Sequence, residues 1–161
     1  MTRQAKGRVA PVKGVHHVGV AVEDLDDAIS SYERLLGAEL AGRETQDAQG
    51  VEAASLRVGT GHVELLAALG PDTPVGRFLA KRGPGMHHLA YEVEDLPAEL
   101  VRLQGEGARL IDPAPRRGLF GTQVAFVHPE SVHGVLSELV QRGGTHGSPA
   151  GPLLTTAGVG G

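Results

Sequence analysis

One short segment occurs twice in this chain, and this internal repeat restricts the possible folds more than any other feature. The segment reads GVHHVGVAVEDL at residues 14–25 and GMHHLAYEVEDL at residues 85–96, an offset of 71 residues. Both copies share G-x-H-H and V-E-D-L at the same positions. A repeat of this kind predicts two copies of one small structural unit that pack against each other.

Each copy is predicted to begin with a β-strand that leads into an α-helix. Valine and histidine alternate between the two faces of the first strand, with His17 on one face and Val18 on the other. Asp24 and Asp95 follow the strands and are suited to cap the helices. The first helix carries an apolar stripe from Leu25 to Leu36 and ends at Gly37, and the second ends near residues 105–107.

Extended stretches follow both helices, and they complete a β-α-β-β-β order in each copy. They are residues 51–58, 62–66, 123–128 and 135–140. A short helix from Thr73-Pro74 to Gly83 is predicted between the copies. The expected fold is α+β: one domain over residues 12–141, made of modules 14–70 and 85–141. Helices shield one face of the curved mixed sheets, and the strands enclose a metal-containing cleft on the other.

The two ends of the chain have a different composition. Residues 1–11 are expected to form a flexible N-terminal segment without the apolar stretch of a secretory signal. Residues 143–161 are rich in Gly, Pro, Ser and Thr and are expected to be a disordered tail. A cytoplasmic location is predicted, and no apolar run reaches the length of a membrane span.

Composition and charge exclude several classes of function. The formal net charge is −4, and the three Phe, two Tyr and absent Trp offer little for base stacking, so nucleic acid is not an expected partner. The chain has no cysteine, which excludes disulfides, thiolate metal sites and cysteine nucleophiles. Any metal must therefore be held by nitrogen and oxygen ligands.

Each module offers one histidine on its first strand and one glutamate on its last. His17 precedes Glu64 by 47 residues, and His88 precedes Glu138 by 50 residues. A carboxylate in an apolar strand needs a partner, and the pairing of the modules would bring all four side chains together. Two imidazoles and two carboxylates suit Co²⁺, Ni²⁺, Mn²⁺, Fe²⁺ or Zn²⁺.

Each of these four residues, taken singly, is also typical of ordinary structure: a packed histidine, or a glutamate at a sheet edge. The recurrence of both residue types at matching positions favours a site. Gly19, Ala21 and Ala90 beside the ligand positions would leave room for a ligand. His16 and His87 fall on the helix-facing side by strand alternation, so supporting roles suit them better.

These motifs resemble the vicinal oxygen chelate superfamily, which includes glyoxalases, bleomycin-resistance proteins and extradiol dioxygenases. Within it, three stretches resemble the methylmalonyl-CoA epimerase family: DTPVGRFL at 72–79, GMHH at 85–88 and HPESVHGVLSEL at 128–139. The resemblance covers about Val12 to Gln141, and the last stretch is its most specific part.

The resemblance implies a metal site and an activity. Its metal ligands correspond to His17, Glu64, His88 and Glu138, and they would hold one divalent ion, with Co²⁺ expected before Ni²⁺, Mn²⁺ or Zn²⁺. The implied reaction interconverts (2R)- and (2S)-methylmalonyl-CoA through a metal-stabilised enolate, with Glu64 and Glu138 as alternating base and acid. Some family members have Gln at the position of Glu64 and a Glu on the preceding strand, where this chain offers Glu52 one position out of register.

The resemblance also implies an acyl-CoA substrate and a homodimer, and it does not choose between methylmalonyl-CoA and ethylmalonyl-CoA. Basic residues should border the cleft to meet CoA, and the candidates in loops and at helix ends are Lys81, Arg82, Arg116 and Arg117. Three alternatives stay open: a glyoxalase I (lactoylglutathione lyase) with the same metal set, an extradiol dioxygenase, and a non-catalytic binding protein of the bleomycin-resistance type.

Overall fold

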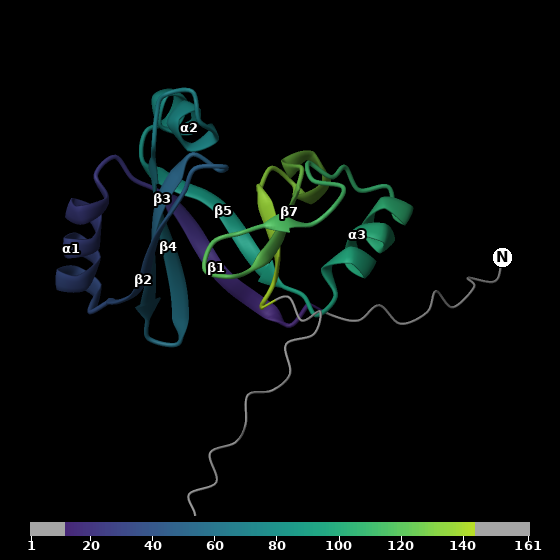
Figure 1. The fold of residues 1–161 in the computed structure, drawn as a ribbon, viewed down its shortest axis with the longest axis horizontal. Helices are drawn as coiled ribbons and strands as arrows, with labels where there is room; N and C mark the ends of the chain where they lie inside the picture. Colours follow the sequence, from purple (N-terminus) through teal and green to yellow (C-terminus); the bar gives the residue numbers. More distant parts are fainter. Residues whose placement is uncertain (1–11, 144–161) are drawn as a thin grey trace, which may run out of the picture.

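The computed structural model describes residues 12–143 and contains two copies of the same order of elements (Figure 1). The first copy and the helix after it comprise β1 (Gly14–Ala21), α1 (Leu25–Leu36), β2 (Glu39–Gln46), β3 (Val51–Val58), β4 (Gly61–Ala68) and α2 (Pro74–Arg82). The second copy comprises β5 (Gly85–Glu92), α3 (Leu96–Gly105), β6 (Arg116–Arg117), β7 (Gln123–Val127), the 3-10 turn η1 (Pro129–Val132) and β8 (Ser137–Gln141). The predicted β-α-β-β-β order, twice, is confirmed.

The strands form one 8-stranded sheet in the order β2-β3-β4-β1-β5-β8-β7-β6. In each copy the first strand pairs in parallel with the last, β1 with β4 and β5 with β8. The two copies join through the antiparallel pair β1 and β5 at the middle of the sheet. The halves are therefore related by an approximate twofold axis between these strands, and the predicted α+β fold with a curved mixed sheet is confirmed.

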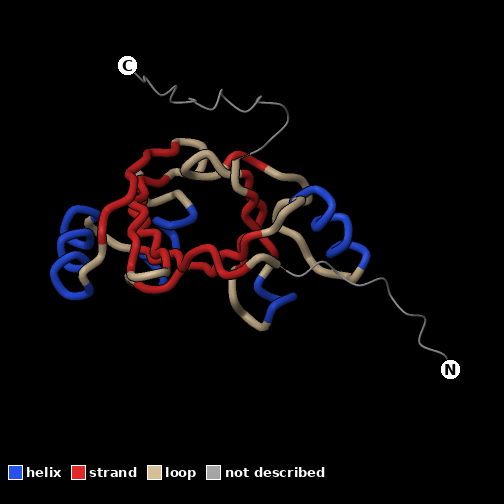
Figure 2. The backbone as a smooth tube through the Cα atoms, turned by 90° about the horizontal axis from the view of Figure 1, so that it is seen from below, coloured by secondary structure: helices blue, strands red, loops and turns tan. Residues whose placement is uncertain are grey.

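The sheet curls into an open half-barrel with α1 and α3 outside it, and α2 lies at one end (Figure 1 and Figure 2). Helix α1 covers β3 and β4 through a core that includes Ile29, Leu56 and Leu65. Helix α3 covers β7 and β8 through Leu96, Leu100 and related side chains. Because α1 and α3 take the outer face, the inner faces of β1 and β5 are left to line the hollow of the half-barrel.

The residues predicted to begin the helices do so through side-chain caps. Asp24 Oδ1 accepts a hydrogen bond from Asp27 N at 2.8 Å, and Asp95 Oδ1 accepts one from Ala98 N at 3.1 Å. Thr73 Oγ1 accepts one from Gly76 N at 3.1 Å. Each bond satisfies a backbone N–H that the first helical turn leaves without a partner.

The segment 117–122 bridges the two ends of the curled sheet. Its Phe120 N donates to Glu44 Oε2 at 2.6 Å, and Gln46 Nε2 donates to the carbonyl oxygen of Gly118 at 3.2 Å. Gln49 Nε2 donates to the Arg117 carbonyl oxygen at 3.4 Å. These bonds tie the second module to the β2–β3 hairpin of the first, across the mouth of the half-barrel.

The sequence missed some local features. Strand β2 has a polar sequence, ELAGRETQ, without clear alternation, and β6 has only two residues. The strand predicted at 135–140 begins instead at Ser137, because the residues before it form η1, which His128 caps, and turn at Gly134 with φ +91°. The predictions for 1–11 and, apart from Gly143, for the tail fall outside the described residues. Within residues 12–143 no helix is long and apolar enough to cross a membrane.

Candidate metal centre

The strand register brings the four predicted residues onto one face at the centre of the sheet. Glu64 on β4 lies beside Gly19, which pairs in turn with His88 on β5. The second row is its equivalent: His17 on β1 pairs with Ala90, which lies beside Glu138 on β8. Each row thus holds one glutamate and one histidine from different modules, with a small residue between them.

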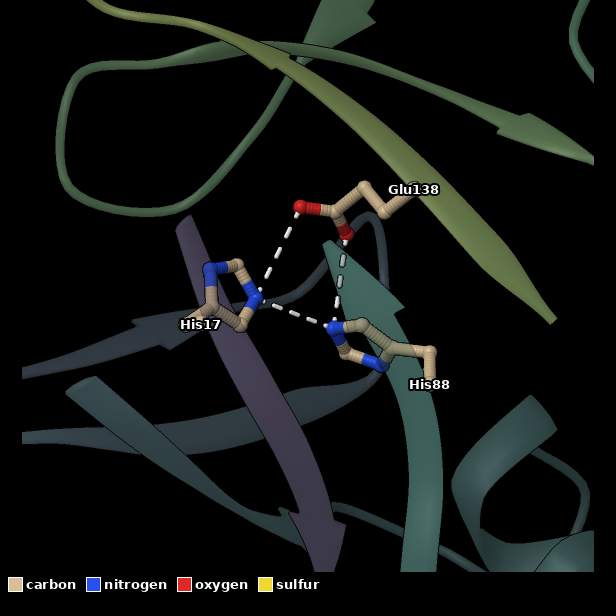
Figure 3. Close-up of side chains that lie close together, drawn as sticks. All are labelled: His17, His88 and Glu138. Atoms are coloured by element: carbon tan, nitrogen blue, oxygen red, sulfur yellow. Dashed lines mark hydrogen bonds and ion pairs between the residues drawn. The ribbon is translucent and has the colours of Figure 1, made fainter. Parts of the chain in front are cut away.

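Three of the four side chains meet closely (Figure 3). The Nε2 atoms of His17 and His88 are 3.0 Å apart. Glu138 reaches both rings, with Oε1 at 3.8 Å from His17 Nε2 and Oε2 at 3.7 Å from His88 Nε2. One ligand atom from each of these residues lies within 4.8 Å of the others. The three residues therefore converge on a common point from β1, β5 and β8.

Glu64 lies at the side of this group nearest to His17. Its Oε2 is 3.5 Å from His17 Nε2, and it does not belong to the group in which all ligand atoms lie within 4.8 Å. All four residues are buried, between 4% and 7% exposed. The four residues thus form one buried group, in which Glu138 approaches both imidazoles and Glu64 approaches that of His17.

The neighbouring histidines support the two central imidazoles. Both strands carry an irregularity in register, at His16 in β1 and at His87 in β5, where one extra residue has no partner. His16 Nδ1 is 2.7 Å from His17 Nδ1, and His87 Nδ1 is 3.0 Å from His88 Nδ1. These contacts occupy Nδ1 of each central ring and leave Nε2 facing the group.

The irregularities also explain why the alternation of side chains along a strand did not fully predict which way His16 and His87 point. His87 does pack toward a helix, with its ring 5.0 Å from that of Phe78 on α2. His16 instead lines a cavity of about 280 Å³ together with His17. The predicted supporting role is consistent with both positions.

Burial disfavours every charge in this group. It lowers the pKa of His17 to about 3, with the neighbouring His16 and His62 acting in the same direction. It lowers the pKa of His88 well below the usual value. Burial raises the pKa of Glu64 to about 7, aided by Glu44. It raises the pKa of Glu138 well above the usual value, and the charge of Glu64 adds to this effect.

The donors fit a divalent metal ion. Both imidazoles are neutral near pH 7 and present Nε2, the form in which histidine ligates metals. Two nitrogens that each lie about 2.1 Å from one ion are about 3.0 to 3.4 Å apart, depending on the angle, and the 3.0 Å between His17 and His88 meets this. Two buried carboxylates without a Lys or Arg ion pair among the described residues also need a positive charge close by.

Two cavities and a groove adjoin the centre. The cavity of about 280 Å³ is partly polar and includes Ser55 and Thr122. A cavity of about 220 Å³ is mainly apolar and includes both glutamates. A groove of about 780 Å³ runs along α2 and β5 and shares His88 with the second cavity. The centre is therefore buried in the fold but bordered by space for a small molecule.

The strand residue considered as a further base lies away from the centre. Glu52 on β3 accepts a hydrogen bond at 2.6 Å from Nε of Arg43, which also pairs with Asp26. The apolar cavity is reached instead by Ala48 and Gln49 of the β2–β3 turn. On β3 itself Val51 lines this cavity, and Glu52, the next residue along the strand, faces the other side of the sheet.

Two further residues line the apolar cavity beside the centre, and the sequence motifs did not point to them as part of it. Leu119 in the bridging segment is buried and lines both cavities, and Arg116 borders the apolar one. No sequence signal pointed to Leu119. Arg116 was predicted only as one of several cations that could meet CoA.

The chain is similar to known proteins over most of its length. The profile of the Glyoxalase/Bleomycin resistance protein/Dioxygenase superfamily matches residues 16–126. An ethylmalonyl-CoA/methylmalonyl-CoA epimerase of Cereibacter sphaeroides is 38% identical over 129 residues, which cover 79% of this chain and 96% of that protein.

Solved structures of similar proteins share the whole fold. The crystal structure of a methylmalonyl-CoA epimerase from Mycobacterium tuberculosis superposes with a TM-score of 0.80 at 40% identity, covering 88% of this chain and 97% of that one. A methylmalonyl-CoA epimerase in complex with methylmalonyl-CoA and NH4+ has a TM-score of 0.79 at 35% identity, covering 82% and 96% of the two chains.

Proposed function

The chain belongs to the glyoxalase/bleomycin resistance protein/dioxygenase superfamily and, within it, to the methylmalonyl-CoA epimerase family, and we propose that it interconverts the 2R and 2S epimers of methylmalonyl-CoA with one divalent metal ion. One observation carries the proposal beyond family membership. Two buried carboxylates from equivalent strands, Glu64 and Glu138, flank a pair of neutral imidazoles beside an apolar cavity.

Epimerisation requires a base on one side of C2 and an acid on the other. The proton on C2 is acidic because the carbanion formed on its removal is delocalised onto the thioester. The metal, held by His17, His88 and the two glutamates, would supply positive charge that offsets the negative charge developing on the substrate. The protein residues carry out the proton transfers themselves.

In the proposed cycle, one or both glutamates would loosen from the metal during turnover, so that one begins ionised and the other protonated. The ionised carboxylate takes the C2 proton from one face, and the carboxylic acid of the other gives its proton to the opposite face. C2 is thereby inverted, and the two glutamates have exchanged protonation states. The pKa of Glu64, raised by burial to about 7, suits a group that must both accept and release a proton near neutral pH.

The surroundings suit an acyl-CoA. The apolar cavity of about 220 Å³ would hold the acyl group, and the groove of about 780 Å³ that begins beside His88 would take the longer CoA portion. Helix α2 places three cations along this groove, Arg77, Lys81 and Arg82. Their charges complement the phosphates of CoA.

The decisive experiment follows the C2 proton. Protein loaded with Co²⁺ is incubated in D₂O with a single epimer of methylmalonyl-CoA, and C2 is followed by NMR, with an EDTA-treated sample as the control. We expect deuterium uptake together with loss of stereochemistry, and we expect EDTA to abolish both. Absence of exchange in both samples would reject the proposed activity. Equal exchange in both samples would reject the metal requirement alone.

A further inference from the structure

A single cation borders the apolar cavity beside the metal centre. The described residues that line this cavity are mostly apolar, among them Val51, Leu66, Val75 and Leu136, and Arg116 is the one Lys or Arg in the set. A charge against low-polarity walls acts more strongly on a ligand than the same charge in open solvent. Arg116 is therefore placed to affect whatever enters the cavity.

The Arg116 side chain is held from two directions. Its Nε lies 3.3 Å from Oδ2 of Asp112, and this oxygen also accepts a hydrogen bond from Phe126 N at 2.8 Å. Its Cζ lies 5.4 Å from the centre of the Phe126 ring, a cation–π distance. The Phe126 ring in turn packs edge-on against His88, with centroids 5.6 Å apart. The guanidinium is thus tied to the same framework that positions a metal-site histidine.

The outer part of the guanidinium is left available. Within residues 12–143, neither terminal nitrogen of Arg116 makes a hydrogen bond, and its one ion pair is through Nε. Paired terminal N–H groups match the two oxygens of a carboxylate.

Resting on the proposed function, we propose that Arg116 binds the free carboxylate of the substrate and so selects acyl-CoA molecules that carry a carboxylate on C2. This carboxylate is what distinguishes methylmalonyl-CoA from a simple acyl-CoA. Its capture by a fixed cation would orient C2 between Glu64 and Glu138. Asp112 would hold the arginine in position without competing for its terminal nitrogens.

The test compares two substrates of similar shape, of which only one carries the carboxylate. Methylmalonyl-CoA is compared with 2-methylacetoacetyl-CoA, in which a neutral acetyl group replaces the carboxylate and C2 keeps an acidic proton. C2 deuterium exchange is measured in D₂O with Co²⁺-loaded protein and corrected for the uncatalysed rate. Arg116→Gln removes the charge. Arg57→Gln is the matched control, because Arg57 is also an arginine paired with one carboxylate, that of Glu39, and does not line the cavity.

For Arg116→Gln we expect KM for methylmalonyl-CoA to rise about 10- to 100-fold, as is typical for loss of one partner of a desolvated charge pair. Exchange with 2-methylacetoacetyl-CoA should change less than about twofold, and Arg57→Gln should resemble the wild type for both. Arg116→Lys, which keeps the charge but not the paired geometry, should give a smaller rise in KM for methylmalonyl-CoA alone.

The possible failures are distinguishable. If the wild type exchanges neither substrate, the proposed function falls and this inference with it. If the wild type is active and Arg116→Gln leaves both substrates unaffected, the role of Arg116 is refuted and the proposed function stands. An equal loss for both substrates in Arg116→Gln and Arg116→Lys also refutes it, since that pattern indicates contact with CoA or a structural role.

Discussion

Gly19 leaves the space that the imidazole ring of His88 occupies. A Cβ atom at Gly19 would lie 2.6 Å from Nε2 of His88 and closer still to its Cε1 and Nδ1. The two residues are direct partners in the β1–β5 pairing. The small residue that was expected to make room for a ligand thus makes room for one of the metal-site histidines.

Substitution of Gly19 by alanine should therefore damage the metal centre. The added methyl group must displace the His88 ring, so we expect Co²⁺ affinity to fall at least about 10-fold, the lower end of the effect of disturbing a ligand's support. Overpacking should also lower the free energy of unfolding by about 1–3 kcal/mol. Metal content is measured by mass spectrometry after dialysis, and stability by urea unfolding.

Gly61→Ala provides the control for this substitution. It also adds a methyl group to a strand glycine, and the nearest atom to its Cβ would be the Val58 carbonyl oxygen at an ordinary 3.6 Å. This variant should bind Co²⁺ as the wild type does. Wild-type affinity in Gly19→Ala would show that the site tolerates a shifted His88 ring.

The two supporting histidines should matter for metal binding although neither belongs to the four-residue set. His16→Ala and His87→Ala each remove the contact at Nδ1 of the adjacent central ring. We expect Co²⁺ affinity to fall about 10- to 100-fold in each variant, the usual effect of losing a partner that orients a ligand. Titration with Co²⁺, followed by visible absorption, measures the change.

His62→Gln is the matched control for these variants. His62 is exposed and lines the same cavity as His16, but it makes no hydrogen bond to His17 or His88. Its substitution should change Co²⁺ affinity by less than about threefold, in line with a solvent-screened neighbour. An equal loss in His62→Gln and His16→Ala would contradict a specific supporting role.

The repeat explains how far the sequence alone could go. Equivalent residues of two copies must lie at equivalent places about a twofold axis. The matching positions of the two histidines and of the two glutamates therefore predicted that these four side chains converge: His17, His88, Glu64 and Glu138. The starts of the helices could also be predicted, because the capping residues Asp24, Asp95 and Thr73 act within one helical turn.

Features that depend on contacts between the two modules could not be predicted from local sequence patterns. The bridge from residues 117–122 to Gln46 and Gln49 depends on how far the sheet curls, which no local pattern encodes. The irregularities at His16 and His87 arise only when β1 meets β5. Arg116 likewise gains its position from Asp112 and Phe126, which lie outside the quoted motifs.

Metal binding should release protons. At pH 6 the carboxyl of Glu64, whose pKa burial raises to about 7, is mostly protonated, and His17 is neutral. Burial also raises the pKa of Glu138 and so favours its protonated form. A metal requires the ionised carboxylates, so affinity should rise with pH, by about 10- to 100-fold per unit below pH 7. Calorimetry in buffers of different ionisation enthalpy should detect one to two protons released at pH 6. Release of none would contradict the protonated state of the glutamates.

The two glutamates should act on opposite faces of C2. In Glu64→Gln and in Glu138→Gln we expect epimerisation to fall about 10²- to 10⁴-fold, as for removal of a general acid or base. Each variant should still exchange the C2 proton of one epimer with retention, and the epimer should differ between the two variants. NMR in D₂O, starting from each pure epimer, measures this, with metal content checked in parallel. Full epimerisation by Glu64→Gln would refute the two-glutamate scheme.

The cations of α2 should contribute to binding of CoA and not to the chemistry. Lys81 and Arg82 lie at the end of α2 and line the groove that begins beside His88. In the double variant Lys81→Gln/Arg82→Gln we expect KM for methylmalonyl-CoA to rise about 10-fold with kcat unchanged, and its dependence on salt to weaken. Methylmalonyl-pantetheine lacks the nucleotide phosphates, so its KM should not respond. Arg34→Gln on α1, outside the groove, is the control. A matching rise in KM for both substrates would place the phosphates elsewhere on the protein.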